Sequence, residues 1–262
     1  MSRISETFTR LREEKRRALI PFITAGDPDL DATRALIVEL ARAGATLVEL
    51  GVPFSDPMAD GPVIQRASER ALRGGVGVAD ALAVVAEARR ETDVPVVLFS
   101  YYNPLLQFGA ERLCAQARDA GVNGMLVTDL APEESSQFAA TLRAHELDLI
   151  FLVAPTSTDE RLRRIAERAS GFIYAVSRAG VTGVQSASSA EAGRLVERVR
   201  AVTDLPVAVG FGISTREQVA DVWRYADAAV VGSAIVAEIE KWGDAPDLAA
   251  HIGGFARGLL PS

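Results

Sequence analysis

The sequence predicts an α/β protein made of about eight strand–helix units in series. Short apolar runs alternate with longer amphipathic segments along almost the whole chain. Most of these runs are rich in Val, Ile, Leu or Phe and lack polar alternation, which is typical of strands buried on both faces of a parallel sheet. Right-handed units of this kind form either a closed barrel or a long, open, doubly wound sheet, and periodicity does not distinguish the two.

The expected elements follow one another in a regular order. The candidate strands are residues 19–23, 47–50, 94–99, 124–128, 148–153, 172–175, 207–209 and 228–231. The candidate helices between them are 31–43, 79–92, 110–120, 133–145, 159–169, 190–202 and 215–225, where apolar residues recur at three- and four-residue spacing. Further helices are expected at 8–17 and 248–260. Thr158 and Ser214 are expected N-caps, and Gly44 and Gly121 are expected to end helices.

Composition predicts one domain over residues 1–262, because no linker or composition shift divides the chain. The net charge of −7 argues against nucleic acid as the main partner but permits a small phosphorylated ligand. Cys114 is the only cysteine, residues 2–17 lack the apolar core of a secretory signal, and no apolar run approaches the ~18 residues of a membrane span. A soluble, cytoplasmic protein is expected.

Glycine-containing turns follow the last three candidate strands, at 179–183, at Gly210-Phe211-Gly212 and at Gly232-Ser233. Glycine lets a ligand approach the backbone closely and exposes amide N–H groups. The last turn opens a helical segment, and barrel enzymes often bind phosphate with the loops after the seventh and eighth strands. Three such turns favour a phosphate site, although each alone fits an ordinary strand-to-helix turn.

Two acids are candidate catalytic residues. Glu49 stands near the end of an apolar strand, where a carboxylate is costly unless it is paired or functional. A salt bridge to arginine is the structural alternative, whereas the strand end favours catalysis. Asp60 lies in the long, proline-rich segment 53–62, and a turn beside Gly61 is its alternative interpretation.

Lysine and histidine are scarce, which narrows the chemistry. Lys15, Lys241, His145 and His251 all belong to or flank predicted helices rather than strand ends. Schiff-base catalysis, a histidine-based metal site and a Ser-His-Asp triad are therefore not expected, and no metal is predicted. Chemistry at this site would depend on carboxylates, hydroxyls and backbone dipoles.

Four segments resemble the motifs of the tryptophan synthase α-chain family. They are 21–28 (PFITAGDP), 49–62 (ELGVPFSDPMADGP), 177–183 (SRAGVTG) and 209–214 (VGFGIS). The resemblance extends from the N-terminal helix to 232–236 (GSAIV), and Met58 stands where the family usually has leucine. It implies a (β/α)₈ TIM barrel with an extra N-terminal helix. It also implies retro-aldol cleavage of indole-3-glycerol phosphate to indole and glyceraldehyde 3-phosphate, in tryptophan biosynthesis.

The resemblance also implies roles for individual residues. Glu49 would be the general acid at indole C3, Asp60 would accept a hydrogen bond from the indole N–H, and Tyr174 would position the substrate unless it is a core residue. Thr182 would belong to a loop that closes over the substrate. The phosphate would be held by Gly183, Gly212, Gly232 and Ser233. The indole would be walled by Phe22, Leu98, Leu126, Phe211 and Val230, each of which could equally be barrel core.

The family implied by the resemblance works as an α₂β₂ tetramer that passes indole to a β subunit carrying pyridoxal phosphate, while the α chain needs no cofactor. Contact with that subunit would involve 53–62 and 101–107, although the latter also fits an ordinary loop. Three alternatives stay open: a stand-alone indole-3-glycerol phosphate lyase, another phosphate-binding barrel such as an isomerase of histidine or tryptophan biosynthesis, and a silent barrel that only activates a β subunit.

Overall fold

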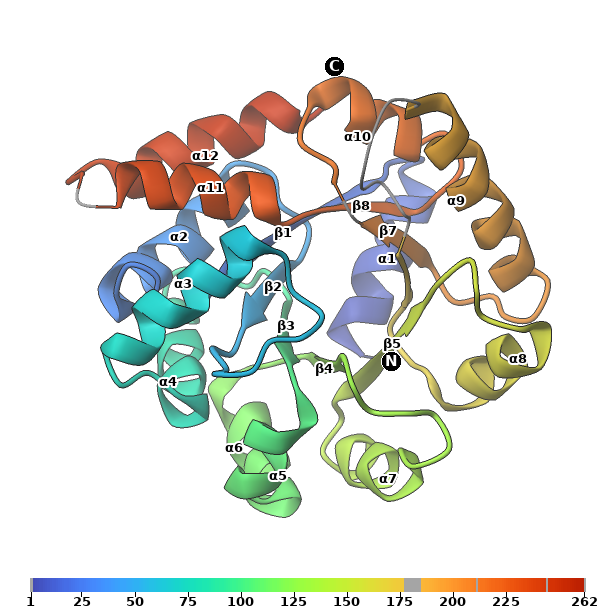
Figure 1. Ribbon diagram of the computed structural model, residues 1–262, viewed down its shortest axis with the longest axis horizontal. Helices are drawn as coiled ribbons and strands as arrows, with labels where there is room; N and C mark the ends of the chain where they lie inside the picture. The colour runs from blue at the N-terminus through green and yellow to red at the C-terminus, as the bar shows by residue number, and fades with distance from the viewer. Residues whose placement is uncertain (1, 177–184, 211, 244, 262) are drawn as a thin grey trace.

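The computed structural model describes residues 2–176, 185–210, 212–243 and 245–261, without the side chains of 185–188. Eight parallel strands form a closed barrel in sequence order, and β8 pairs with β1. Figure 1 shows the strands in the centre with the helices arranged around them. The closed barrel decides between the two arrangements that periodicity left open, and the (β/α)₈ expectation is confirmed.

All eight predicted strands are present, with ends shifted by at most two residues. Their bounds are β1 Ala18–Thr24, β2 Val48–Gly51, β3 Val96–Ser100, β4 Gly124–Val127, β5 Asp148–Val153, β6 Ile173–Val176, β7 Val207–Gly210 and β8 Ala228–Val231. Nearly every strand residue is buried, as expected when helices cover the outer face of a parallel sheet and side chains fill its interior.

The helices surround this barrel and also close one of its ends. They are α1 Arg3–Glu13, α2 Leu30–Arg42, α3 Pro62–Arg73, α4 Val78–Ala88, α5 Tyr102–Phe108, α6 Ala110–Ala120, α7 Ser136–Ala144, α8 Asp159–Arg168, α9 Gln185–Arg200, α10 Arg216–Val222, α11 Ser233–Trp242 and α12 Leu248–Leu259. Several expectations differ from the structure. Helix α3 was not among the predicted helices, and α9 begins at Gln185 rather than at residue 190. The first helix begins at Arg3 because Ser2 caps it, and 102–108 is helical rather than a loop.

Helix ends agree largely with the expected capping residues. The Thr158 side chain accepts a hydrogen bond from the Arg161 amide and caps α8, as predicted. Thr215, one residue later than expected, caps α10 in a reciprocal arrangement with Gln218. Gly121 ends α6 with a φ of 87°, a left-handed conformation that suits glycine.

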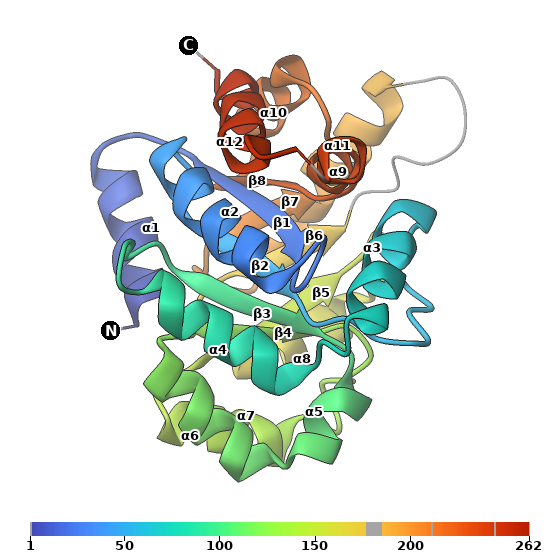
Figure 2. The same ribbon diagram turned by 90° about the vertical axis from the view of Figure 1, so that its left-hand side faces the viewer.

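The core has an inner and an outer part. The outer part lies between strands and helices, whereas the inner part fills the barrel with side chains such as Ile20, Leu126 and Val230. Helix α1 covers the amino ends of the strands, and Phe8 packs on Phe172 with ring centroids 5.8 Å apart. Figure 2 shows α1 at one end of the barrel and the segment preceding α3 at the other. The carboxyl ends of the strands are therefore left for a ligand.

Arg89 fastens the amino ends of two neighbouring strands. Its guanidinium donates to the carbonyls of Gly121 (2.8 and 3.0 Å) and Val94 (2.6 Å) and to Asn123 Oδ1 (3.0 Å). Burial lowers the pKa of Arg89 to about 10. Val94 and Asn123 lie just before β3 and β4, so one side chain holds both strand starts.

Arg89→Met is expected to lower the free energy of unfolding by roughly 3 kcal/mol, because it leaves the carbonyls of Gly121 and Val94 without their partner in a half-buried place. Urea unfolding would measure the loss. Arg90→Met, which alters the exposed neighbour, should change stability by less than about 0.5 kcal/mol. Equal stability of both variants would show that the Arg89 hydrogen bonds contribute little.

Candidate active site

Glu49 lies inside the barrel, on strand β2. Strand β2 pairs Glu49 with Phe22 of β1 and Val97 of β3. Its side chain is 1 % exposed, and neither carboxylate oxygen has a hydrogen-bond partner within the described part of the chain. The salt-bridge alternative therefore has no support. Burial raises the pKa of Glu49 to about 8, so the side chain is largely protonated at neutral pH.

Tyr174 projects from β6 into the same interior, where it packs on the inner core. Burial, followed by the charge of Glu49, raises the pKa of the Tyr174 hydroxyl well above its usual value, so the phenol is a neutral donor. A Cβ at position 210 would lie 2.1 Å from Tyr174 Oη, so the strand end of β7 must carry glycine there. The sequence indicated Gly210 only as part of a phosphate turn, and its role as space for Tyr174 was missed.

Aromatic and aliphatic side chains line the barrel interior near the carboxyl ends of the strands. The Phe22 ring meets Phe99 edge to face, with centroids 5.3 Å apart. A Cβ at Gly51 would lie 2.6 Å from the Phe22 ring, so this glycine makes room for it. Leu126 and Val230 belong to the inner core. Their role as walls of a ligand site stays a prediction.

Leu98 is a core residue, which is the alternative that the sequence left open for it. Its side chain belongs to the outer core, because alternation along β3 turns Val97 and Phe99 inward instead. Phe99 and Leu152, which the sequence analysis did not name, are half-buried and pack on the inner core. Counting alternate positions from Glu49 across the strand register would have found them.

Asp60 lies in the connection between β2 and α3, and neighbouring residues hold that connection in place. The Tyr101 hydroxyl accepts a hydrogen bond from the Ala59 amide (2.9 Å), and Gln65 Nε2 donates to the Asp60 carbonyl (2.9 Å). Burial raises the pKa of Asp60 to about 6, which the Tyr101 hydroxyl partly offsets. Asp60 is therefore mostly an anion at neutral pH, in contrast to Glu49. Tyr101 was expected only as a contact residue, and its support of this segment was missed.

The predicted phosphate cradle is described in part. Gly212 has a φ of 71°, and Gly232 precedes the first residue of α11, Ser233. The Ile235 and Val236 amides bond back to the Gly232 carbonyl, so the amides before them are free of intrahelical bonds, as at any helix start. A helix N-terminus of this kind attracts anions. Thr182, Gly183 and Phe211 lie outside the described residues.

The two histidines belong to the helical layer and not to the strand ends. His145 is 3.5 Å from Glu111, and His251 is 3.2 Å from Glu238 and stacks on Trp242. In residues 2–176, 185–210, 212–243 and 245–261, no group of three or more His, Cys, Asp or Glu side chains is arranged to hold a metal ion. None of the helices described there is long and apolar enough to cross a membrane.

The barrel holds a buried, protonated carboxyl group and a second, ionised carboxyl group, and a helix begins behind a glycine at the same end. These features define a phosphate-binding barrel enzyme with acid–base chemistry. The family model described as "Tryptophan synthase alpha chain" matches residues 8–252. Proteins of that name from Geobacter sulfurreducens and Solibacter usitatus are 51 % and 48 % identical over 259 residues, covering 99 % of this chain and 98 % and 97 % of theirs.

Solved structures indicate the same family. Tryptophan synthase subunit alpha from Legionella pneumophila is 38 % identical with a TM-score of 0.92, covering 99 % of this chain and 97 % of that one. The aminoacrylate-bound tryptophan synthase from M. tuberculosis contains a chain that is 41 % identical with a TM-score of 0.87, covering 99 % and 100 %. The chain belongs to the tryptophan synthase alpha chain family.

This membership decides the activity. The chain is a carbon–carbon lyase that cleaves indole-3-glycerol phosphate in tryptophan biosynthesis. The alpha chain uses no cofactor of its own, and the pyridoxal phosphate of tryptophan synthase is in the beta subunit. Another phosphate-binding barrel is thereby excluded.

Proposed function

We propose that Glu49 moves the protons of this cleavage. The observation that carries the proposal is a fully buried carboxyl group without a partner in the described chain, whose pKa is raised to about 8. Such a group is protonated at neutral pH, and because its pKa is close to that pH, the transfer of its proton to a nearby carbon base costs little free energy.

The proposed steps balance as a retro-aldol reaction. Glu49 protonates indole C3, which places a positive charge on the ring nitrogen. The bond from C3 to the adjacent glycerol carbon then breaks, and its electron pair restores the aromatic ring. The hydroxyl on that carbon gives its proton to the Glu49 carboxylate and becomes the aldehyde of glyceraldehyde 3-phosphate. Indole leaves with Glu49 reprotonated.

Asp60 would stabilise the cation that forms in the first step. With its pKa raised only to about 6, Asp60 is still mostly ionised when Glu49 is protonated. An anion that accepts a hydrogen bond from the ring N–H lowers the energy of the charged intermediate, and this effect is strong in a site shielded from water. The two carboxyl groups thus have complementary states at the same pH.

The other residues would bind the two ends of the substrate. Phe22, Leu126 and Val230 would wall the indole together with Phe211, and Tyr174 would orient it through its hydroxyl. The phosphate would lie at the start of α11, held by Gly232 and Ser233 with Gly212 and Gly183. Thr182 would close over the substrate in a loop that meets Asp60.

We also propose that the chain works with a β subunit in an α₂β₂ assembly in the cytoplasm, to which it passes indole. The proposed contact surface consists of 53–62 and 101–107. Met58 is 86 % exposed and Leu106 53 %, although both side chains are apolar. Exposed apolar side chains beside an active site are typical of a protein contact. The lone, buried Cys114 suits a reducing compartment.

Indole release by the purified chain, with and without a tryptophan synthase β subunit, tests this proposal. Slow release that rises sharply with the partner is expected. Rapid release that does not change with the partner would identify a stand-alone lyase. No release under either condition would contradict the proposed chemistry and leave only a chain that activates its partner.

Met58→Asp should weaken binding to the β subunit at least tenfold and reduce its stimulation of cleavage, because a charge would be buried in an apolar contact. The unstimulated rate should change less than twofold. Titration of indole release against β subunit measures both values. Leu72→Asp is the matched control, since Leu72 is 37 % exposed at the far end of α3. Equal loss in both variants would contradict the proposed surface.

A further inference from the structure

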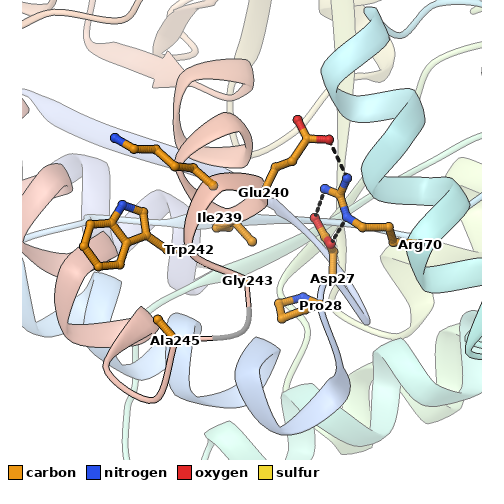
Figure 3. A pocket seen from close by; sticks show the side chains of 9 residues that line it. Asp27, Pro28, Arg70, Ile239, Glu240, Trp242, Gly243 and Ala245 are labelled. Carbon is orange, nitrogen blue, oxygen red and sulfur yellow. Dashed lines mark hydrogen bonds and ion pairs between the residues drawn. The ribbon is translucent and has the colours of Figure 1, made fainter.

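Four charged side chains connect three segments beside the barrel mouth: Asp27 after β1, Arg66 and Arg70 of α3, and Glu240 of α11. Arg70 Nε and Nη2 donate to the two Asp27 oxygens at 2.7 and 2.9 Å, and Arg70 Nη1 donates to Glu240 Oε1 at 2.7 Å. Figure 3 shows Arg70 between Asp27 and Glu240 on the wall of a pocket of about 300 Å³. We call these four residues the Arg70 network.

Two arginines of α3, Arg66 and Arg70, bind Glu240 of α11. Arg66 Nε and Nη2 also donate to both Glu240 oxygens, at 2.7 and 2.6 Å. Hydrogen bonds from Arg66 lower the pKa of Glu240 to about 2, so these contacts persist at any pH at which the enzyme works. Asp27 is only 1 % exposed, whereas Arg66 reaches solvent. Two positive and two negative groups leave the network neutral, and paired bonds fix the geometry more narrowly than apolar contacts do.

Both helices lead directly to the proposed substrate contacts. Helix α3 begins at Pro62, two residues after Asp60, and Gln65 in its first turn donates to the Asp60 carbonyl. Helix α11 begins at Ser233, behind the Gly232 cap. Ala67 of α3, which lies between Arg66 and Arg70, packs together with Val236 of α11 and Phe22. These apolar contacts are not directional, whereas the paired hydrogen bonds of the Arg70 network hold α3 and α11 at one separation.

We propose that Arg70 and Glu240 are positioning residues that set the separation between Asp60 and the start of α11. They thereby select a ligand in which an aromatic N–H donor and a phosphate group lie at one fixed distance. The inference rests on the proposed function, in which Asp60 binds the ring nitrogen and α11 binds the phosphate. A displacement of about 1 Å in such an arrangement is enough to reduce catalysis substantially.

A merely structural role makes a different prediction. If the network only stabilised the fold, its loss would lower the unfolding temperature and weaken all ligands alike. If it sets a separation, a ligand that contacts both ends loses affinity, while a ligand that contacts only α11 does not. The ratio of the two affinities is therefore the decisive quantity.

Calorimetric titration of three single variants and one double variant measures this ratio. Glu240→Gln weakens the tie from α11, and Arg70→Lys weakens it from α3 while keeping a positive charge beside Asp27. Glu238→Gln is the control, because Glu238 lies on the same helix but pairs with Lys241 and His251. The probes are glycerol 3-phosphate, which spans only the phosphate end, and a non-cleavable compound in which a propyl chain joins indole to phosphate.

Glu240→Gln is expected to raise the Kd of the two-ended compound about tenfold, because it weakens the contacts of both arginines with α11. Arg70→Lys should raise it by a smaller factor, since the Arg66 contacts remain, and the double variant should not exceed Glu240→Gln. The Kd of glycerol 3-phosphate should change less than twofold, as should both values in Glu238→Gln. Should Arg70→Lys fail to fold, Glu240→Gln still decides the question.

Suppose that the unsubstituted chain binds the two-ended compound more tightly than glycerol 3-phosphate. The inference is then overturned if the variants bind both probes equally more weakly, or if their affinity for the two-ended compound does not fall. If the unsubstituted chain binds the two-ended compound no better than glycerol 3-phosphate, the proposed substrate placement itself is wrong and the inference falls with it.

Discussion

Glu49→Gln is expected to lower the rate of indole release by about 10³-fold or more, because the amide can neither donate a proton to C3 nor accept one from the hydroxyl. The variant keeps the shape of the side chain, so binding of glycerol 3-phosphate at the start of α11 should change less than twofold. Single-turnover measurement of indole release, with calorimetric titration of the phosphate compound, tests both halves of the expectation.

Asp148→Asn provides the matched control. Asp148 is also a buried carboxyl group, but it lies at the amino end of β5, where its carboxylate accepts a hydrogen bond from Ser2. Its replacement should leave the rate of indole release within about twofold, since it is remote from the reacting atoms. Cleavage retained by Glu49→Gln would contradict the proton transfer proposed here, and equal loss in both variants would indicate a general effect on folding.

Glu49→Gln is also expected to stabilise the protein in alkaline solution. The pKa of Glu49 is about 8 in the folded chain and 4.5 as the ordinary value, so the folded state holds a proton that the unfolded state has already released between these values. Stability therefore falls as the pH rises from about 4.5 to 8. By linkage, the penalty at pH 8 and above is on the order of 4 kcal/mol, and glutamine abolishes it.

Urea unfolding of the wild-type chain and of Glu49→Gln at pH 5 and pH 8.5 measures this effect. The two proteins should have similar free energies of unfolding at pH 5, and the variant should be more stable by a few kcal/mol at pH 8.5. A difference that is the same at both pH values would mean that the pKa of Glu49 is not raised by folding. Such a result would also remove the reason for its acid role.

The barrel could be predicted from sequence because its signal is local. Each strand is a short apolar run followed by a helix with a regular apolar stripe, so all eight strands were found within two residues of their ends. The helix at 102–108 was missed, since a seven-residue segment with a proline has little periodicity to detect.

Side-chain direction was harder to predict than strand position. Glu49 was found because a charge inside an apolar strand is unusual, but Leu98 and Phe99 look alike when both faces of a strand are buried. The support of the Asp60 segment by Tyr101 joins residues 42 apart, and the Arg70 network joins three segments through contacts between residues up to 174 apart. Such contacts carry no local pattern, so only the folded structure reveals them.

The ionisation of the Glu49 carboxyl group can be measured in the folded chain. Difference infrared spectra between the wild-type chain and Glu49→Gln, recorded from pH 5 to pH 10, isolate the carboxyl band of this one residue. We expect a carboxyl group that is protonated at pH 7 and ionises near pH 8. A carboxylate already ionised at pH 5 would contradict the proposal that Glu49 donates the proton that starts cleavage.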